Sequence, residues 1–348
     1  MVSILKKLFN GLFVFLGVAV LVFVLFQGMG DPARLIAGQS ADKKTYENIR
    51  KDLYLDQPIY KQLAMYLNDI SPISIHSNED ISKKKLKGFF FGNETKLGIK
   101  FPYLRSSYQT KKDTFSVLMQ ALPGTIILAT AAMVIACAGG ILLGIISAVY
   151  KNTWIDRLSV FSSIAGISAP SFFVAILMAY LFGMVLHEYT GLNLSGSLFE
   201  IDEVTGEKFL NLKNLILPAI TLGIRPMAVI TQLTRSSMLD VMSQDYIRTA
   251  YAKGLSRNKV IFHHALRNAL NPVITAVTGW FAELLAGAFF IEYIFGWQGL
   301  GKVTVDALEK LDYPIVMGSV LLSALIFIIM NILSDIIYRI VDPRIKNN

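Results

Sequence analysis

Long runs of apolar residues set the first limit on what this chain can fold into. Six such runs cover about 8–26, 121–148, 158–186, 215–233, 273–294 and 315–338. Each approaches or exceeds the roughly 20 residues that a helix needs to cross a bilayer. Hydrophobic residues make up 53% of the 348 positions, and the mean hydropathy is +0.51, both too high for an ordinary soluble domain. The sequence therefore predicts an all-α integral membrane protein with six transmembrane helices.

Basic residues are unevenly distributed between the two sets of short segments that connect these runs. Lysine and arginine are enriched in cytoplasmic loops, and long loops are left out of the comparison because they cross regardless of charge. One set contains Lys6, Lys7, Lys151, Arg157, Arg235, Arg248, Lys253, Arg257, Lys259, Arg267, Arg339, Arg344 and Lys346, and the other contains Lys208, Lys213, Lys302 and Lys310. We therefore expect both termini and segment 244–272 in the cytoplasm. The net charge of +8 follows this bias and does not indicate nucleic-acid binding.

The first apolar run defines the domain organisation of the N-terminal region. Its length and the lack of a convincing A-x-A cleavage site predict a retained transmembrane helix over residues 1–28 rather than a cleaved signal. We expect an extracytoplasmic loop or small subdomain over 29–116, a five-helix core over 117–340 and a cytoplasmic tail over 341–348.

Small residues in the second run predict how its helix packs. They recur at every fourth position, at Ala132, Ala136, Gly140, Gly144 and Ala148. On a helix they form one stripe that lets another backbone approach closely, so we expect a packing face within the subunit or toward a partner.

The third run is interrupted by a proline. Pro170 removes a backbone donor between Ser168 and Ser171, which predicts a kink whose freed carbonyls the two hydroxyls can satisfy. Such a break either lines a pathway or simply bends the helix.

A polar segment, 244–272, separates the fourth and fifth runs and predicts a helix, a break and a second helix. Gly254 suits the residue just past a helix C-terminus, because glycine tolerates positive φ. Ser256 suits the N-cap of the next helix, and Asn271 followed by Pro272 predicts a further helix start.

The first helix of this segment is predicted to be amphipathic. Its apolar face contains Tyr246, Ile247, Ala250 and Tyr251, and Arg248 and Lys253 lie off that face. Such a helix either lies on the lipid surface or places its apolar face in a groove on a partner protein. The residues alone favour the lipid surface.

Motifs that would carry catalysis or nucleotide binding are not complete in this sequence. Residues 296–302 read G-x-x-x-x-G-K, but Val303 stands where a phosphate-binding loop needs Ser or Thr. We therefore expect only a turn between the fifth and sixth spans. The single Cys137 and the adjacent His263 and His264 offer no metal-ligand spacing, and there is no HExxH motif. An enzyme is not expected.

Two charged residues lie near the middle of apolar runs, where charge is costly. Arg225 and Glu283 are expected to approach each other across a helix interface, as a structural pair or beside a substrate path. Glu283 also leaves a proton-coupled secondary transporter open, although such a carrier needs no docking helix. Glu292 and Asp335 lie nearer the membrane edges and are expected to be solvated or snorkelling.

Several motifs together resemble one family of membrane proteins. The run YIRTAYAKGL, the following HALRNALNP, and GLG and DPR further on resemble the permease subunits of binding-protein-dependent ABC importers, in the branch that carries dipeptides, oligopeptides or nickel. GDPARL at 30–35 and the segment 53–67, in which Pro58 could open a short helix, resemble the N-terminal pattern of the same branch. The family's E-A-A-x-x-x-G loop appears with Arg248 for Glu, Thr249 for Ala, then Ala250 and Gly254. The Leu-Pro that follows in the family reads Leu266-Arg267.

This resemblance implies a role and a set of partners. The chain would be a permease in a bacterial inner membrane and form half of the path for peptides, with nickel as the alternative cargo. A second related permease, two cytoplasmic ATPases and an extracytoplasmic binding protein would accompany it, with membrane lipid around it. This chain would bind no cofactor, and ATP and magnesium would lie on the ATPases. The coupling residues would be Tyr246, Arg248, Thr249, Ala250, Lys253, Gly254 and Leu255, and the pathway candidates Ser168, Pro170, Ser171, Arg225 and Glu283.

One segment, 71–112, is longer than is usual in that family. It contains Lys83, Lys84, Lys85 and Lys87 followed by three phenylalanines at 89–91. We expect a loop or small subdomain on the outer side. It either contacts the binding protein or is a solvated variable loop, and the irregular pattern favours the solvated loop.

Overall fold

The described part of the chain folds into two compact units. The computed structural model describes residues 2–28, 33, 43, 46–47, 50, 54–201, 206–286 and 288–341. One unit contains residues 1–122 and 303–325, and the other contains residues 123–302 and 326–348. Apart from Ala33, the motif at 30–35 lies outside the described residues, as does the DPR motif at 342–344.

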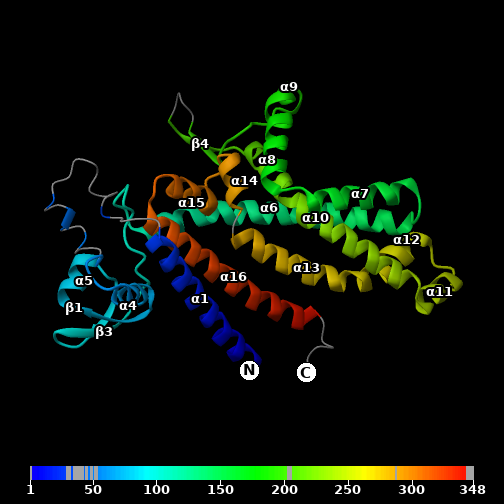
Figure 1. Ribbon diagram of the computed structural model, residues 1–348. Helices are drawn as coiled ribbons and strands as arrows, with labels where there is room; N and C mark the ends of the chain where they lie inside the picture. Colours follow the sequence, from blue (N-terminus) through cyan, green and yellow to red (C-terminus); the bar gives the residue numbers. More distant parts are fainter. Residues whose placement is uncertain are drawn as a thin grey trace. The chain divides into compact units, whose positions relative to one another are not determined.

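The predicted all-α membrane fold is confirmed. Five helical segments in the described residues are long and apolar enough to cross a membrane, and one bent helix pair brings the total to as many as six. The elements that form these spans are α1 (Val2–Gly28), α6 (Thr114–Val149), α7 (Trp154–Ser168) with α8 (Ser171–Tyr180), α10 (Lys213–Met242), α13 (Leu266–Ala286) and α16 (Tyr313–Val341). Figure 1 shows these helices as the dominant elements of the chain.

The third span is broken more sharply than a kink. Helices α7 and α8 meet at 108° across Ala169 and Pro170. Ala169 is extended, with ψ 131°, because the residue before a proline is disfavoured in the helical region. Pro170 then occupies the N-cap of α8, without a side-chain capping bond. Beyond α8 the chain continues through a π-helix, Leu181–Val185, and the short α9 (His187–Thr190).

The fifth span begins and ends earlier than the sequence predicts. It runs over Arg257–Ala286, through α12 (Arg257–Lys259), a π-helix (Val260–Ala265) and α13. The helix start expected at Asn271 and Pro272 is wrong, because Pro272 lies inside α13. Ala269 and Val273 on either side of it are both 1% exposed, so packing keeps this stretch helical at the cost of one backbone hydrogen bond.

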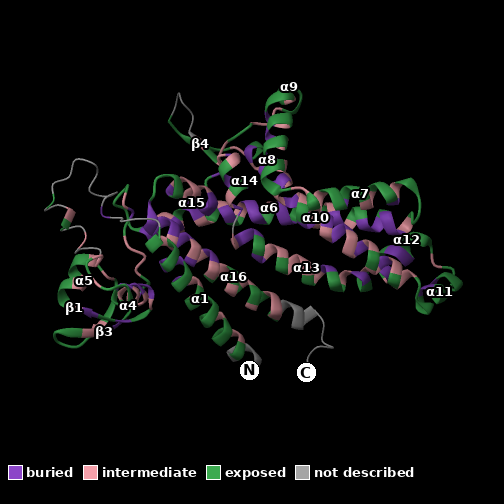
Figure 2. Ribbon diagram, viewed as in Figure 1, coloured by how far each residue is buried: buried purple, intermediate pink, exposed green. Residues whose placement is uncertain are grey.

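Helices α6 and α10 pack closely along the predicted small-residue stripe. All five stripe residues are buried. A Cβ added at Gly140 would come within 2.7 Å of Ile230, and one at Gly144 within 2.5 Å of Thr234. The stripe is therefore confirmed as a packing face within the subunit, and Figure 2 shows buried residues along both helices.

Smaller elements lie between the later spans. Strands β4 (Phe199–Ile201) and β5 (Lys208–Leu210) form an antiparallel hairpin before α10. Helix α14 (Phe289–Ile294) follows α13, and α15 (Leu300–Glu309) precedes α16.

Residues 59–100, within the region predicted as a loop or small subdomain over 29–116, form a small subdomain. It contains α4 (Ile59–Ile70), β1 (Ile73–Ser77), α5 (Asn78–Lys84), β2 (Gly88–Phe91) and β3 (Thr95–Lys100). The strands form an antiparallel sheet in the order β1-β3-β2. Pro58 is the N-cap of α4, so the helix expected after this proline is present.

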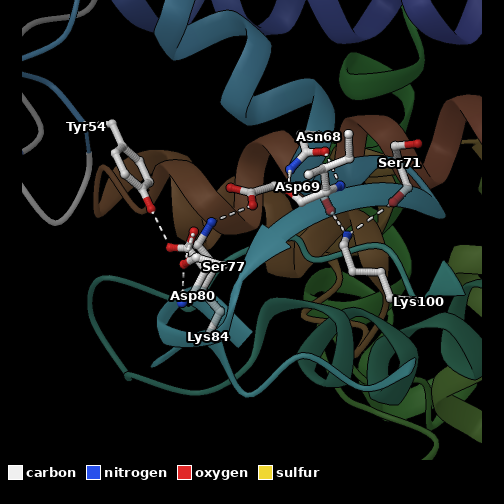
Figure 3. Close-up of polar contacts among 9 residues, drawn as sticks. Tyr54, Asn68, Asp69, Ser71, Ser77, Asp80, Lys84 and Lys100 are labelled. Atoms are coloured by element: carbon white, nitrogen blue, oxygen red, sulfur yellow. Dashed lines mark hydrogen bonds and ion pairs between the residues drawn. The ribbon is translucent and has the colours of Figure 1, made fainter. Parts of the chain in front are cut away.

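A buried lysine lies between α4 and the sheet of this subdomain. Lys100 is 4% exposed, and its ammonium donates to the carbonyl oxygens of Asp69 at 2.5 Å and Ser71 at 3.1 Å. Figure 3 shows these bonds beside a second group that joins Tyr54, Asp80 and Ser77. Burial lowers the pKa of Lys100 to about 8.

This lowered pKa predicts a pH-dependent stability. The folded chain loses the proton near pH 8, whereas the unfolded chain keeps it to about 10.5. Between these values the unfolded state binds more protons, so the subdomain becomes more stable as the pH rises. Burial raises the pKa of nearby Tyr54 and Tyr103, so these phenols oppose the trend only as the pH approaches their unfolded value of 10. Chymotryptic cleavage at 89–91 in detergent, normalised to an unstructured peptide, should be slower at pH 9.5 than at pH 7.5. The Lys100→Met variant should lack this dependence, and equal dependence in both proteins would contradict the assignment.

Candidate functional site

The predicted coupling segment forms a short helix and a tight turn between α10 and α13. Helix α11 spans Asp245–Ala252. Gly254 follows it with φ +77°, a left-handed conformation that glycine adopts at little cost. Its N–H donates to the carbonyl of Tyr251, and the N–H of Leu255 donates to the carbonyl of Ala250. This pair of bonds is a Schellman motif, so the predicted helix end at Gly254 is confirmed.

The second boundary of the segment is only partly as predicted. Ser256 lies at the N-cap of α12, but its side chain makes no capping hydrogen bond. The guanidinium of Arg257 instead lies 3.5 Å from the carbonyl oxygen of Val149 at the end of α6. This contact ties the turn to the neighbouring helix.

The apolar side of α11 is buried within the chain itself. Ile247 is 2% exposed and Ala250 is 7% exposed. They belong to a core cluster that also contains Ile145, Ala148, Met238, Val260, Ile261, Ala265 and Ala269. Helices α6, α10 and α13 and the π-helix at 260–265 supply these residues, and together they form a platform for α11.

The exposed side of α11 differs from the apolar face predicted from the sequence. Tyr246 and Tyr251 are 43% and 42% exposed and flank the buried pair instead of joining it. Arg248, Thr249 and Lys253 are exposed, and the Arg248 ion pair with Asp245, at 3.6 Å, is a surface contact. A partner can therefore reach a polar and aromatic surface, made of Tyr246, Arg248, Thr249, Tyr251 and Lys253, which we call the α11 surface.

A buried ion pair that the sequence analysis missed holds the platform together. Asp156 at the start of α7 is 3% exposed and receives Arg235 of α10 in a bidentate contact, at 2.6 and 2.9 Å. The Ser147 hydroxyl donates to the same carboxylate at 2.5 Å, and the N–H of Asn152 donates at 2.9 Å. The sequence pattern predicts Arg235 only as one of the basic residues of the cytoplasmic segments. The one sequence signal was an aspartate at the edge of an apolar run.

The predicted pathway residues divide between a cavity and its surroundings. A cavity of about 230 Å³ is lined by residues that include Ser171, Thr221, Arg225, Trp280, Glu283 and Phe290. Ala169 at the helix break also lines it, whereas Ser168 and Pro170 do not. The cavity therefore contains both intramembrane charges and one end of the broken third span.

Arg225 and Glu283 face the same cavity without forming an ion pair. Among the described residues no salt bridge within 4.0 Å joins them. The guanidinium of Arg225 lies 5.8 Å from the centre of the Trp280 ring, one turn before Glu283 on α13. Both side chains are exposed in the chain taken alone. The structure thus favours a position of Arg225 and Glu283 beside the cavity over a structural ion pair between them.

The expectation that Glu292 is solvated is wrong. This side chain is fully buried and accepts the Thr125 hydroxyl at 2.6 Å and the N–H groups of Gly301 and Lys302 at 2.6 and 3.2 Å. It thereby fixes the turn at 296–302 and the start of α15. A Cβ at Gly301 would meet the backbone of Phe289 at 2.5 Å and the Glu292 carboxylate at 2.9 Å, which explains this glycine of the rejected phosphate-loop pattern.

Together these features define a class of protein. Several apolar spans, a broken helix over a cavity with unpaired charges, and a docked helix with an exposed polar surface are typical of a membrane transport subunit. Within the described residues there is no group of three or more His, Cys, Asp or Glu side chains that could hold a metal ion.

Comparison with known proteins identifies the family. The family model described as "Binding-protein-dependent transport system inner membrane component" matches residues 140–347. A second, described as "Binding-prot-dependent transport system membrane comp, N-term", matches residues 1–129. The chain belongs to this family and is a permease subunit of a binding-protein-dependent ABC importer. The resemblance drawn from the 244–301 motifs is confirmed.

Individual relatives match over nearly the whole chain. The glutathione transport system permease protein GsiC of Escherichia coli strain K12 is 35% identical over 330 residues, 94% of each chain. The dipeptide transport system permease protein DppB of Alkalihalophilus pseudofirmus is 33% identical over 347 residues, 96% of each chain. Among solved structures, the inward-facing methionine ABC transporter MetNI matches with a TM-score of 0.49 and 17% identity, covering 66% of this chain and 97% of that one.

The buried ion pair generates a prediction about the platform. Asp156→Asn preserves the shape of the side chain but leaves Arg235 without its counter-ion. We expect a local loss of about 2 kcal/mol, below the ~3–5 kcal/mol of a fully buried pair, because the Arg235 side chain is 26% exposed. Amide exchange in the turn at 149–153 should accelerate about 30-fold in the purified protein. Asp240→Asn, on an exposed position of the same α10, is the matched control, and unchanged exchange in Asp156→Asn would refute the role.

Proposed function

We propose that this chain forms half of a translocation path for peptides and receives the motion of cytoplasmic ATPases through the α11 surface. A second related permease would complete the path, two ATPases would bind ATP and magnesium, and an extracytoplasmic protein would deliver the cargo. The names of the two relatives, a glutathione and a dipeptide permease, support peptides over nickel. The basic residues of the predicted inner segments support cytoplasmic termini and a cytoplasmic α11.

The observation that carries the coupling role is the docking of α11 on its platform. Ile247 and Ala250 are locked into a core shared with the ends of α6 and α10 and the start of the fifth span. Protein cores are densely packed, so a displacement of α11 moves the platform residues with it. The α11 surface stays exposed, as a partner contact requires. Family membership also favours this ATP-driven role over the proton-coupled carrier.

Arg248 is the strongest candidate for direct contact with an ATPase. Its side chain is 79% exposed and its only described ion pair is with Asp245, itself 96% exposed. A surface pair of this kind contributes about 0–1 kcal/mol, so an acidic group on a partner can replace it at little cost. Tyr246 is held nearby because its hydroxyl accepts from Asn268 at 2.9 Å.

A substitution at Gly254 tests the coupling role. No atom lies within 4 Å of a Cβ placed there, so Gly254→Val acts through the backbone alone. A β-branched residue at this positive φ costs about 1–2 kcal/mol, which lowers the equilibrium constant for the docked turn about 5- to 30-fold. We expect peptide uptake per ATP hydrolysed to fall by a similar factor while membrane insertion is unchanged. Gly254→Asn is the control, because asparagine tolerates this conformation. Normal coupling in Gly254→Val would contradict the assignment.

The cavity supports the second part of the proposal, a contribution to the path. A peptide carries an ammonium and a carboxylate, and Glu283 and Arg225 offer the complementary charges in one space. Unpaired intramembrane charges are expensive and commonly mark a substrate pathway. The broken third span contributes Ser171, the first residue of α8, to the same cavity.

A double-mutant cycle separates this role from a structural pair. Arg225→Gln and Glu283→Gln should each lower peptide uptake by about tenfold or more, since a hydrogen bond to a charged group contributes ~1.5–3 kcal/mol. If each residue contacts the peptide, the two losses should multiply in the double variant. A double variant no worse than either single variant would indicate a pair and contradict the pathway role. ATPase activity without peptide should be unchanged in all three.

A further inference from the structure

One face of the three-stranded sheet is apolar and exposed. The strand register places Ile73 beside Ile99 and Ile75 beside Leu97, and on the other side of β3 it places Phe89 beside Ile99 and Phe91 beside Leu97. Side chains two residues apart on a strand share a face, so these residues form one continuous surface. Their exposed fractions run from 55% to 77%. We call this surface the sheet face: Ile73, Ile75, Phe89, Phe91, Leu97 and Ile99.

The opposite face of the sheet is buried and largely polar. Ser74, His76 and Lys100 lie there, at 2%, 4% and 4% exposed. Asn68 of α4 exchanges two hydrogen bonds with the backbone of Ile75, and Lys100 reaches the carbonyls at the end of α4, as Figure 3 shows. This bonding fixes which face points outward. A water-soluble sheet would place its apolar face inward, so the arrangement is inverted relative to a solvated domain.

The subdomain packs along the membrane-spanning part of α1. Phe23 stacks on Tyr66 of α4 with ring centres 5.6 Å apart, and the Gln27 amide donates to Gln62 at 2.6 Å. The same cluster reaches down α1 to Phe15, about 20 Å along the helix from its end at Gly28. Many other α1 side chains, such as Leu12 and Leu21, are exposed as lipid-facing residues are. The sheet is therefore attached beside the span and not beyond its end.

Basic side chains flank the sheet face. Lys87 directly precedes β2 and shares the strand alternation of Phe89 and Phe91, Lys85 lies between α5 and β2, and Lys83 lies at the end of α5; all three are exposed. Residues 54–113 contain ten basic and six acidic residues. Exposed aromatic and aliphatic groups bordered by lysines are the composition of protein surfaces that lie in the interface of a membrane with anionic lipids.

We propose that the sheet face rests in the interfacial region of the leaflet at the Gly28 end of α1, with Lys87, which directly precedes β2, at phospholipid headgroups. The side chains enter about 5–10 Å, as interfacial elements do. Deeper insertion is excluded because β2 is an edge strand, and the backbone groups on its outer edge need water or headgroups. The sequence predicts two alternatives, a solvated loop or a docking site for the binding protein. Both leave six large apolar side chains in water for at least part of the transport cycle. Exposed patches of this kind are rare on soluble surfaces.

Depth-dependent fluorescence quenching tests this proposal on the full-length protein. Phe91→Cys, in a Cys137→Ala background, is labelled with bimane in nanodiscs of phosphatidylethanolamine and phosphatidylglycerol. Replacing part of the lipid with chains brominated near the headgroup should reduce its fluorescence by about twofold or more. Ser82→Cys on the exposed side of α5 is the matched control and should not be quenched. Leu97→Cys, on the same sheet face, provides an independent reading if the label at 91 disturbs folding.

Two results would overturn the proposal. Equal fluorescence of the face labels with and without brominated lipid would show that the sheet face does not enter the membrane. A change that appears only when the purified binding protein or partner permease is added would assign the face to that protein. Quenching of the face labels but not of the control, without any added protein, is the result that supports lipid contact.

Discussion

The close approach of α6 and α10 is the constraint on which the described sites depend. Gly140 and Gly144 allow it, because any larger side chain would overlap Ile230 or Thr234. In a membrane, lipid tails are as apolar as leucine, so helices gain stability from tight packing and from polar contacts instead of from hydrophobic burial. The Asp156 and Arg235 pair provides such a polar contact between α7 and α10 near the α11 platform, and Ser147 of α6 donates to the same carboxylate. Packing and charge therefore both act on α10, the first from α6 and the second from α7.

The buried carboxylates show a shared design with different partners. Asp156 is neutralised by an arginine and further bonded by a hydroxyl and a backbone N–H. Glu292 has hydroxyl and backbone N–H donors among the described contacts, and these come from Thr125 of α6 and from the first residues of α15. A buried charge without such donors would be strongly destabilising. Each carboxylate thus connects segments that lie far apart in the sequence.

Local sequence signals predicted those features whose physics is local. The spans follow from hydropathy, the packing stripe from four-residue spacing, and the helix end at Gly254 from the conformational freedom of one residue. Asp156, Glu292 and the sheet face could not be predicted in the same way. Their environments depend on residues up to 167 positions away, as in the bond between Thr125 and Glu292. The alternation of Ile73, Ile75, Leu97 and Ile99 was visible, but their pairing was not. Asn271 and Pro272 show the converse, since tertiary packing overrode a local start signal.

Helices α10 and α13 contribute to both the α11 platform and the cavity, and α7 is bonded to the platform helices. Helix α7 begins with Asp156, which is bonded to the platform helices, and ends at the break where Ala169 lines the cavity. Helix α10 contributes Arg235 to the buried ion pair with Asp156 and Arg225 to the cavity. The two arginines are ten residues, or about 15 Å, apart along the helix. These helices pack along each other, as Figure 1 shows. A helix resists compression and bending over such lengths. We infer that a movement of the platform is transmitted to the cavity walls unless α7 bends. The break at Ala169 and Pro170 separates α7 from α8 beside the cavity, and we propose that a shift of the platform changes the angle between these helices and thereby the shape of the cavity.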